Sequence, residues 1–141
     1  MRSDGGWSSG DECLVLPNGT KTHGQCLDEY GQPTPDPLRF PDLASTAAEV
    51  NKRGLKLGLW TIRGVYASAV AARSKIKGTQ YTVDALVDTA SPGGGPNGSC
   101  LWAKDSLGVN MSHPAAQTYY DHHVAKLASF GIDFIKADCM M

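Results

Sequence analysis

The sequence predicts an α/β protein, a fragment of a (β/α)8 barrel that holds about three strands followed by long loops. Two helix patterns end at a glycine and run directly into apolar strands, which is typical of alternating helices and parallel strands. The turns from helix to strand are short, whereas the segments 5–40 and 62–112 after the strands are long. Long loops at the carboxyl ends of the strands are a property of one face of such barrels.

The first helix is predicted over residues 41–54, "PDLASTAAEVNKRG". Pro41 or Asp42 would begin it, and Gly54 would cap its C-terminal end. A short apolar strand, "LKLGLWTI", follows at residues 55–62. The apolar residues of the helix fall on one side and would cover a sheet: Leu43, Ala47 and Val50.

The clearest helix pattern begins at Ser112 or His113 and runs to Gly131. The last strand follows at once, as the apolar run 132–137. The predicted apolar stripe of this helix consists of Ala116, Tyr120, Val124 and Leu127.

The remaining segments are less regular. Residues 1–40 are rich in Gly, Pro, Asp and Asn and are predicted as loops, and "TASPGGGPNGSCLW" is a loop by composition. A short helix is predicted within residues 63–78, and a turn or a second short helix within residues 80–88. No Gly-rich phosphate motif follows either strand, which argues against a nucleotide-binding fold.

Length and charge limit the function classes. The chain has 141 residues, one ordinary domain, whereas a (β/α)8 barrel typically takes about 250. We therefore expect a partial barrel domain over 1–141, cut at both ends, whose missing partner is the remainder of its own barrel. Thirteen basic and fourteen acidic residues give no electrostatic footprint for nucleic acid, and no segment has the length of a membrane span.

Three glycosylation sequons favour an exported protein, although no signal peptide is recognisable. An ordinary Asn-Gly turn followed by a hydroxyl residue is the alternative explanation of such a motif. The candidate sites are Asn18, Asn97 and Asn110.

The four cysteines form no CxxC pair, so a zinc site is not expected. One or two disulfides are predicted if the compartment is oxidising, and with the sequons this favours a secreted, vacuolar or other secretory location. The sequence leaves open whether Cys13 pairs with Cys26 and Cys100 with Cys139, or whether none pairs.

The end of the last strand carries the strongest chemical signal. Alternation along a strand puts Lys136 and Asp138 on one face, where they would reach a barrel rim side by side. An ammonium group beside a carboxyl lowers its pKa and keeps it ionised, as a nucleophile in glycoside hydrolysis must be. A purely structural ion pair is the alternative.

Three further residues are candidates for contacts with a ligand. Trp60 offers an aromatic wall to the apolar face of a sugar, with a core role as the alternative. Asp4 and Trp7, in "SDGGW", stand at the start of the first long loop, where a carboxylate accepts hydroxyl hydrogen bonds. Each of these signals is weak alone.

Together, these motifs resemble the α-galactosidase (melibiase) family of glycoside hydrolases. "GLKLGLWTIRG" and "GIDFIKADC" are similar to two successive strands of that family, and "SDGGW" resembles an earlier strand end with paired aspartates. "DEYGQPTPDPLRFP", "KGTQYTVDAL" and "SCLWA" resemble a branch found in plant- and microbe-type members. The resemblance covers nearly the whole chain in the same order.

This resemblance implies a retaining hydrolase of terminal α-linked sugars, with α-galactosides as the expected substrates and no cofactor. Asp138 matches the nucleophile, which forms a glycosyl-enzyme intermediate with the anomeric carbon. The family's general acid/base is an aspartate on a later strand, so negligible turnover is expected of this chain alone. The implied sugar-binding residues are Asp4, Trp7, Trp60 and Lys136.

The chain departs from the family pattern in two of these motifs, "SDGGW" and "GIDFIKADC". Gly5 replaces the second aspartate of the pair, which puts strict galactose recognition in doubt. Cys139 follows Asp138 directly, whereas better-known members place one residue between them, so the family's disulfide is not simply transferable.

Other functions are also considered. A Schiff-base lysine of the aldolase type is less favoured for Lys136, because Asp138 raises the pKa that such a lysine needs lowered. A non-catalytic sugar-binding or inert barrel remnant is the non-enzymatic alternative. His113, Asp121, His122 and His123 suggest a metal site, but a solvated helix face explains them better.

Overall fold

The computed structural model describes residues 2–3, 5–16, 18–90, 98, 100, 102–103 and 105–139. The chain divides into two compact units. The first comprises Met1–Asp28, Pro33–Thr61 and His123–Ala137, and the second comprises Glu29–Gln32, Ile62–His122 and Asp138–Met141.

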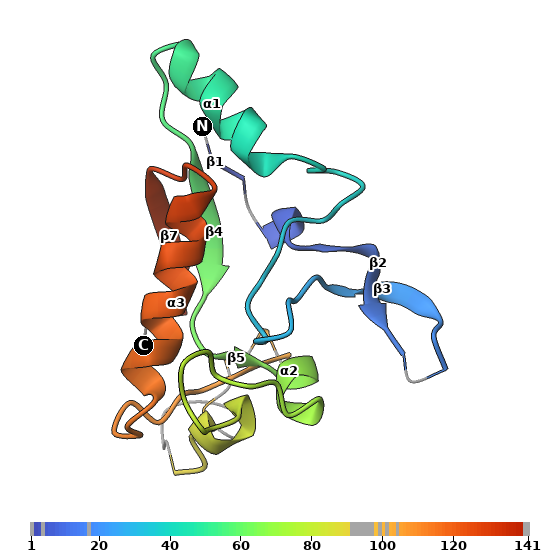
Figure 1. Ribbon diagram of the computed structural model, residues 1–141, viewed down its shortest axis with the longest axis vertical. Helices are drawn as coiled ribbons and strands as arrows, with labels where there is room; N and C mark the ends of the chain where they lie inside the picture. The colour runs from blue at the N-terminus through green and yellow to red at the C-terminus, as the bar shows by residue number, and fades with distance from the viewer. Residues whose placement is uncertain are drawn as a thin grey trace. The chain divides into compact units, whose positions relative to one another are not determined.

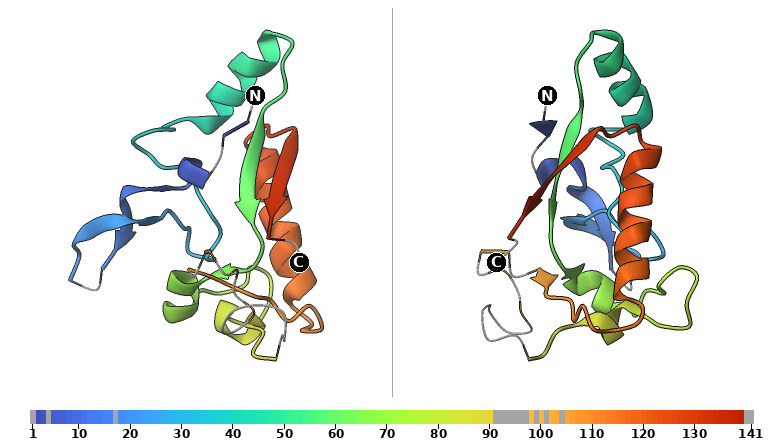
Figure 2. Two further views of the ribbon diagram at one scale, coloured as in Figure 1. Left: turned by 180° about the vertical axis from the view of Figure 1, so that it is seen from behind. Right: turned by 90° about the vertical axis from the view of Figure 1, so that its left-hand side faces the viewer.

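A three-stranded sheet organises the first unit, in the order β1 (Arg2–Ser3), β4 (Gly58–Ile62) and β7 (Phe134–Asp138) (Figure 1). β1 runs parallel to β4. β4 and β7 lie side by side with their arrows pointing the same way (Figure 2). Asp133 N donates to Leu57 O at the start of this pair, at 2.9 Å. The α/β class is confirmed, and the described residues form no closed barrel.

The first predicted helix is confirmed as α1 (Leu43–Lys52). Asp42 is its N-cap, because its Oδ1 accepts a hydrogen bond from Ser45 N at 2.8 Å. The hydrogen bonds from the Ser45 hydroxyl and amide lower the pKa of Asp42. Gly54 follows the helix with φ +72°, the left-handed conformation that ends many helices at a glycine.

The second predicted helix is α3 (Ala116–Ser129), which begins later than expected. Before it, Ala115 N donates to His113 Nδ1 at 3.2 Å in a separate turn. The predicted apolar stripe was partly wrong, because Val124 is 51% exposed. His123 takes the inward position instead, and its Nε2 lies 3.1 Å from Thr61 Oγ1 of β4. The apolar pattern pointed to Val124 because the residue that faces the sheet, His123, is polar.

The core of the first unit lies between one face of the sheet and the two helices. It comprises Trp7, Leu43, Ala47, Leu57, Leu59 and Leu127, with Phe40, Val50, Phe130, Ile132 and Ile135 packed against it. Burial of these apolar side chains is the main stabilising contribution to the unit. It also assigns the faces of the strands: Leu59 and Ile135 point to the helices, so their neighbours along each strand point the other way.

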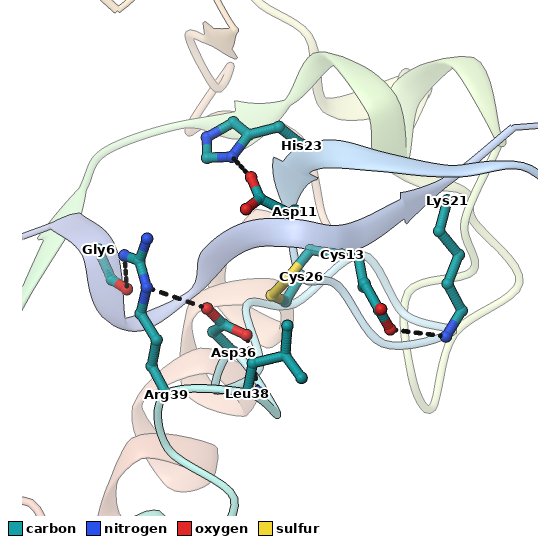
Figure 3. The surroundings of a disulfide bond; sticks show 10 residues. Gly6, Asp11, Cys13, Lys21, His23, Cys26, Asp36, Leu38 and Arg39 are labelled. Carbon is teal, nitrogen blue, oxygen red and sulfur yellow. Dashed lines mark hydrogen bonds and ion pairs between the residues drawn. A yellow bond between two sulfur atoms is a disulfide. The ribbon is translucent and has the colours of Figure 1, made fainter.

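A hairpin, which was predicted as loop, also belongs to the first unit. β2 (Ser9–Val15) and β3 (Lys21–Gln25) pair antiparallel after a short 3-10 helix, η1 (Gly5–Trp7). The hairpin is joined by the Cys13–Cys26 disulfide, by an ion pair between Lys21 and Glu12, and by a contact of His23 Nδ1 with Asp11 Oδ1 (Figure 3). Its residues are mostly polar, and its register shifts between Gly10 and Leu14, so no clean two-residue alternation marks it in the sequence.

The second unit is built from short elements. β5 (Val65–Tyr66) pairs antiparallel with β6 (Ser106–Leu107). α2 (Ala67–Ala71) and the 3-10 helix η2 (Val83–Leu86) confirm the short helix and the turn or second short helix predicted here. Its buried apolar residues include Val65, Ala69, Ile76, Val83 and Leu86. Among the described residues, no helix is long and apolar enough to cross a membrane.

Candidate active site

Strand β7 carries both of the charged residues that the sequence singled out. Because Ile135 packs against the core, Lys136 and Asp138 lie on the opposite face of the strand. Both side chains are partly buried. β7 therefore presents an ammonium group and a carboxylate two residues apart, at the carboxyl end of a parallel strand, the usual place for chemistry in α/β proteins.

Trp60 lies on the same face of the sheet as Lys136, because Leu59 beside it points into the core. It is partly buried, and its backbone oxygen accepts a hydrogen bond from Trp7 Nε1 at 2.8 Å. Trp7 itself is 1% exposed within the core. In this structure, Trp7 thus supports the backbone of Trp60 from the interior rather than lining a surface.

The carboxylate of Asp138 is held by the residue that follows it. Cys139 N donates to Asp138 Oδ1 at 2.8 Å, a contact that favours the negative charge of the carboxylate. Cys139 adopts φ +58°, a left-handed conformation that costs about 1–3 kcal/mol for a residue other than glycine. Such strain is concentrated at functional sites, and here it accompanies the disulfide between Cys139 and Cys100.

Arg63, which the sequence analysis did not single out, joins several segments at the end of β4. Its amide donates to Asp138 O at 3.3 Å, and its Nη2 donates to Gly98 O at 3.0 Å. Ser106 Oγ donates to Arg63 O at 2.5 Å. The sequence does contain a signal for Arg63, because it is a charged residue directly after an apolar strand, in "LWTIRG".

Tyr120 of α3 reaches the same segment. Its hydroxyl oxygen accepts a hydrogen bond from Gly64 N at 3.2 Å. Burial raises the pKa of the Tyr120 hydroxyl, so this group is protonated and uncharged at neutral pH. The contact anchors the turn after β4 to the helix.

Two of the predicted site residues, Asp4 and Asn97, lie outside the described residues. Asn18 and Asn110 are exposed. In each, the side-chain oxygen accepts a hydrogen bond from the amide two residues later, that of Thr20 or Ser112, at 3.0 Å. Both sequons are therefore accessible turns.

The described residues contain one close group of potential metal ligands, Cys13, Cys26 and Asp36 (Figure 3). The two sulfur atoms form a disulfide and are not thiolates, so the group is not suited to a metal ion. Asp36 is buried and accepts a hydrogen bond from Leu38 N at 2.9 Å. The histidines contact different neighbours: His113 meets Tyr81, His122 meets Tyr30, and His123 meets Thr61.

The disulfides are the two pairs that the sequence left open, Cys13–Cys26 and Cys100–Cys139. Each lies within one of the two units. The prediction of disulfide bonds is therefore confirmed.

Comparison with known proteins connects this site to carbohydrate enzymes. No protein-family model matches the chain. An α-xylosidase of Emericella nidulans is 32% identical over 104 residues, which are 70% of this chain and 12% of that protein. A Bacillus halodurans protein described as an α-N-acetylgalactosaminidase is 30% identical, with a TM-score of 0.72 over 82% of this chain and 27% of its own.

The fullest overlap among these is with a GH27 β-L-arabinopyranosidase from Geobacillus stearothermophilus. It is 28% identical, with a TM-score of 0.75 over 96% of this chain and 31% of its own. A variant of that enzyme in complex with arabinose matches equally well, at 27% identity. The chain thus spans less than a third of the length of each of these relatives. The matches confirm the resemblance to the α-galactosidase group, at the level of GH27-type glycoside hydrolases.

Proposed function

We propose, on the premise that this chain resembles GH27-type glycoside hydrolases in sequence and structure, that it is the nucleophile-bearing part of a retaining glycosidase. Its sheet would be an arc of a (β/α)8 barrel. The observation that carries the proposal is the end of β7, where Asp138 terminates a parallel strand two residues after Lys136. The superposition of 96% of the chain on a GH27 enzyme supports it.

In this mechanism the Asp138 carboxylate attacks the anomeric carbon of the sugar and the bond to the leaving oxygen breaks. A second carboxyl group, about 5–5.5 Å from the first in retaining enzymes, gives its proton to that oxygen and later activates the water that releases the sugar. The family resemblance assigns that group to a later strand. Lys136 would donate hydrogen bonds to sugar hydroxyls, and Trp60 would line the sugar pocket.

The expected substrate is a terminal α-galactoside or a close stereochemical relative. N-Acetylgalactosamine is galactose with an acetamido group at carbon 2, and a β-L-arabinopyranoside is an α-D-galactoside without the exocyclic CH2OH group. The names of the two GH27-type structures that match the chain fall in this stereochemical series. Asp4, at the start of the chain, would accept a hydroxyl hydrogen bond, and Trp7 would act by supporting Trp60.

The proposal also places the protein in the secretory pathway, with glycans at Asn18, Asn97 and Asn110. The support is the accessibility of Asn18 and Asn110 and the presence of two disulfides, which persist in oxidising compartments.

A trapping experiment tests the nucleophile directly. A 5-fluoro-α-galactosyl fluoride carries a leaving group that needs no general acid, so Asp138 alone is required for the covalent step. We expect the intact mass to increase by one glycosyl unit and peptide mapping to find it on Asp138. The Asp138→Asn variant should not be labelled.

Asp105→Asn is the matched control, because Asp105 is an exposed carboxylate of the same unit. It should be labelled as the wild type is. Labelling that persists in Asp138→Asn, or that maps to another residue, would show that Asp138 is not the nucleophile.

A further inference from the structure

Trp102 is the most exposed aromatic side chain among the described residues, at 61%. It stands in a tight turn in which Ala103 N donates to Cys100 O at 3.1 Å. An indole ring is among the largest apolar surfaces that a side chain offers, and its N–H group adds a polar end, so it suits a ligand that has both apolar and polar faces. The question is which ligand this ring would meet.

The turn is attached to the strand end that carries Asp138. Cys100 forms its disulfide with Cys139, the residue after Asp138, and the two Cα atoms are 6.1 Å apart. Two residues of chain span at most about 7 Å, so Trp102 is held close to this strand end. Trp102, Cys100, Asp138 and Cys139 all belong to the second unit.

A second set of contacts holds the chain on both sides of the turn. Before it, Gly98 O accepts the hydrogen bond of Arg63 Nη2, and after it, Ser106 Oγ donates to Arg63 O. Gly98 also packs so closely on Gly108 that a Cβ at position 108 would lie 2.7 Å from Gly98 O. Cys100 is therefore held by a disulfide, and Gly98 and Ser106 are held by Arg63, whose own amide donates to Asp138 O.

We propose that Trp102 is a substrate-binding residue, on which a pyranose ring stacks with its C–H face while the sugar is held beside Asp138. The inference rests on the proposed function and adds a residue to which the family resemblance assigned no role. The axial and equatorial C–H groups of a pyranose form an apolar patch that fits an indole face. Because Cys100 and Ser106, on either side of Trp102, are already held, less conformational entropy is lost when a sugar binds.

Kinetics of three variants test the stacking in the full-length enzyme, in which a later strand supplies the general acid/base. With 4-nitrophenyl α-D-galactopyranoside and 4-nitrophenyl β-L-arabinopyranoside as probes, Trp102→Ala should raise KM about tenfold and leave kcat within about twofold. Trp102→Phe should restore most of the affinity, because it keeps an aromatic face. Met111→Ala is the matched control, because Met111 is an equally exposed apolar side chain (58%) of the same unit, and it should change neither constant.

A binding measurement keeps the test independent of turnover. The indole N–H resonance of Trp102, assigned by its loss in Trp102→Phe, should shift saturably with methyl α-D-galactopyranoside or L-arabinose.

The outcomes separate the two proposals. If Asp138→Asn abolishes hydrolysis while Trp102→Ala leaves KM unchanged, the stacking role is overturned and the proposed function stands. If no glycoside is hydrolysed but the Trp102 resonance shifts saturably, the sugar site stands and the hydrolase proposal fails. Absence of any shift with both sugars overturns the stacking role whatever the activity.

Discussion

The single residue Gly58 leaves room for the ring of Phe134 on the face of the sheet opposite the helices. A Cβ at this position would collide with the ring of Phe134 on the neighbouring strand. The ring is 44% exposed and can move partly aside, so we expect Gly58→Ala to lower the free energy of unfolding by about 1 kcal/mol, the lower end of the cost of overpacking. Urea unfolding followed by fluorescence measures this loss.

A double-mutant cycle checks the cause. With Phe134→Ala in the background, Gly58→Ala should cost far less, because the colliding ring is gone. An equal cost in both backgrounds would mean that the collision is not the reason for the glycine.

Asp133 acts at the scale of the elements, because it joins the residues that precede β4 and β7. Its carboxylate accepts hydrogen bonds from Lys56 Nζ at 2.9 Å and Leu57 N at 3.0 Å. The Lys56 bond first, and the Leu57 amide second, lower the pKa of Asp133 below its usual value of 3.8. The resulting stabilisation is complete above the unfolded-state pKa and is lost as the pH falls through the lower folded-state pKa.

We therefore expect Asp133→Asn to be less stable than the wild type at pH 7, with a difference that narrows from about pH 5 to pH 2. Urea midpoints across this range measure it. Asp121→Asn is the control for a surface carboxylate, because Asp121 is exposed on α3. A difference that stays constant with pH would contradict the role of the charge.

At the scale of the whole molecule, the two disulfides set the conditions in which the protein is stable. They close segments separated by 13 and 39 residues, and loss of a native disulfide typically costs about 2–5 kcal/mol. Protein made in a eukaryotic secretory pathway should contain no free thiol among these four cysteines and should lose mass on treatment with peptide N-glycosidase. Reduction should lower its urea midpoint.

Asn18→Gln and Asn110→Gln should each remove one glycan, whereas Asn51→Gln, outside any sequon, should remove none. Secreted protein of unmodified mass would rule out glycosylation, and an unchanged urea midpoint after complete reduction would rule out stabilisation by the disulfides.

The sequence by itself determined the local structure wherever one segment carries its own signal. Asp42 and Gly54 bound α1, and the apolar runs around Leu59 and Ile135 become β4 and β7 because capping and burial act over a few residues. It also placed Lys136 and Asp138 on one face, since alternation along a strand is a local property. The family motifs pointed to the same strand end.

Only the tertiary structure decided what depends on contacts between distant segments. The polar hairpin β2–β3 exists through cross-strand pairs and a disulfide, His123 rather than Val124 faces the sheet, and Trp7 packs inside. Arg63 and the Trp102 turn meet the end of β7 through hydrogen bonds and a disulfide between segments far apart in the chain. Such contacts form when the chain closes on itself, and no local pattern encodes which residues they join.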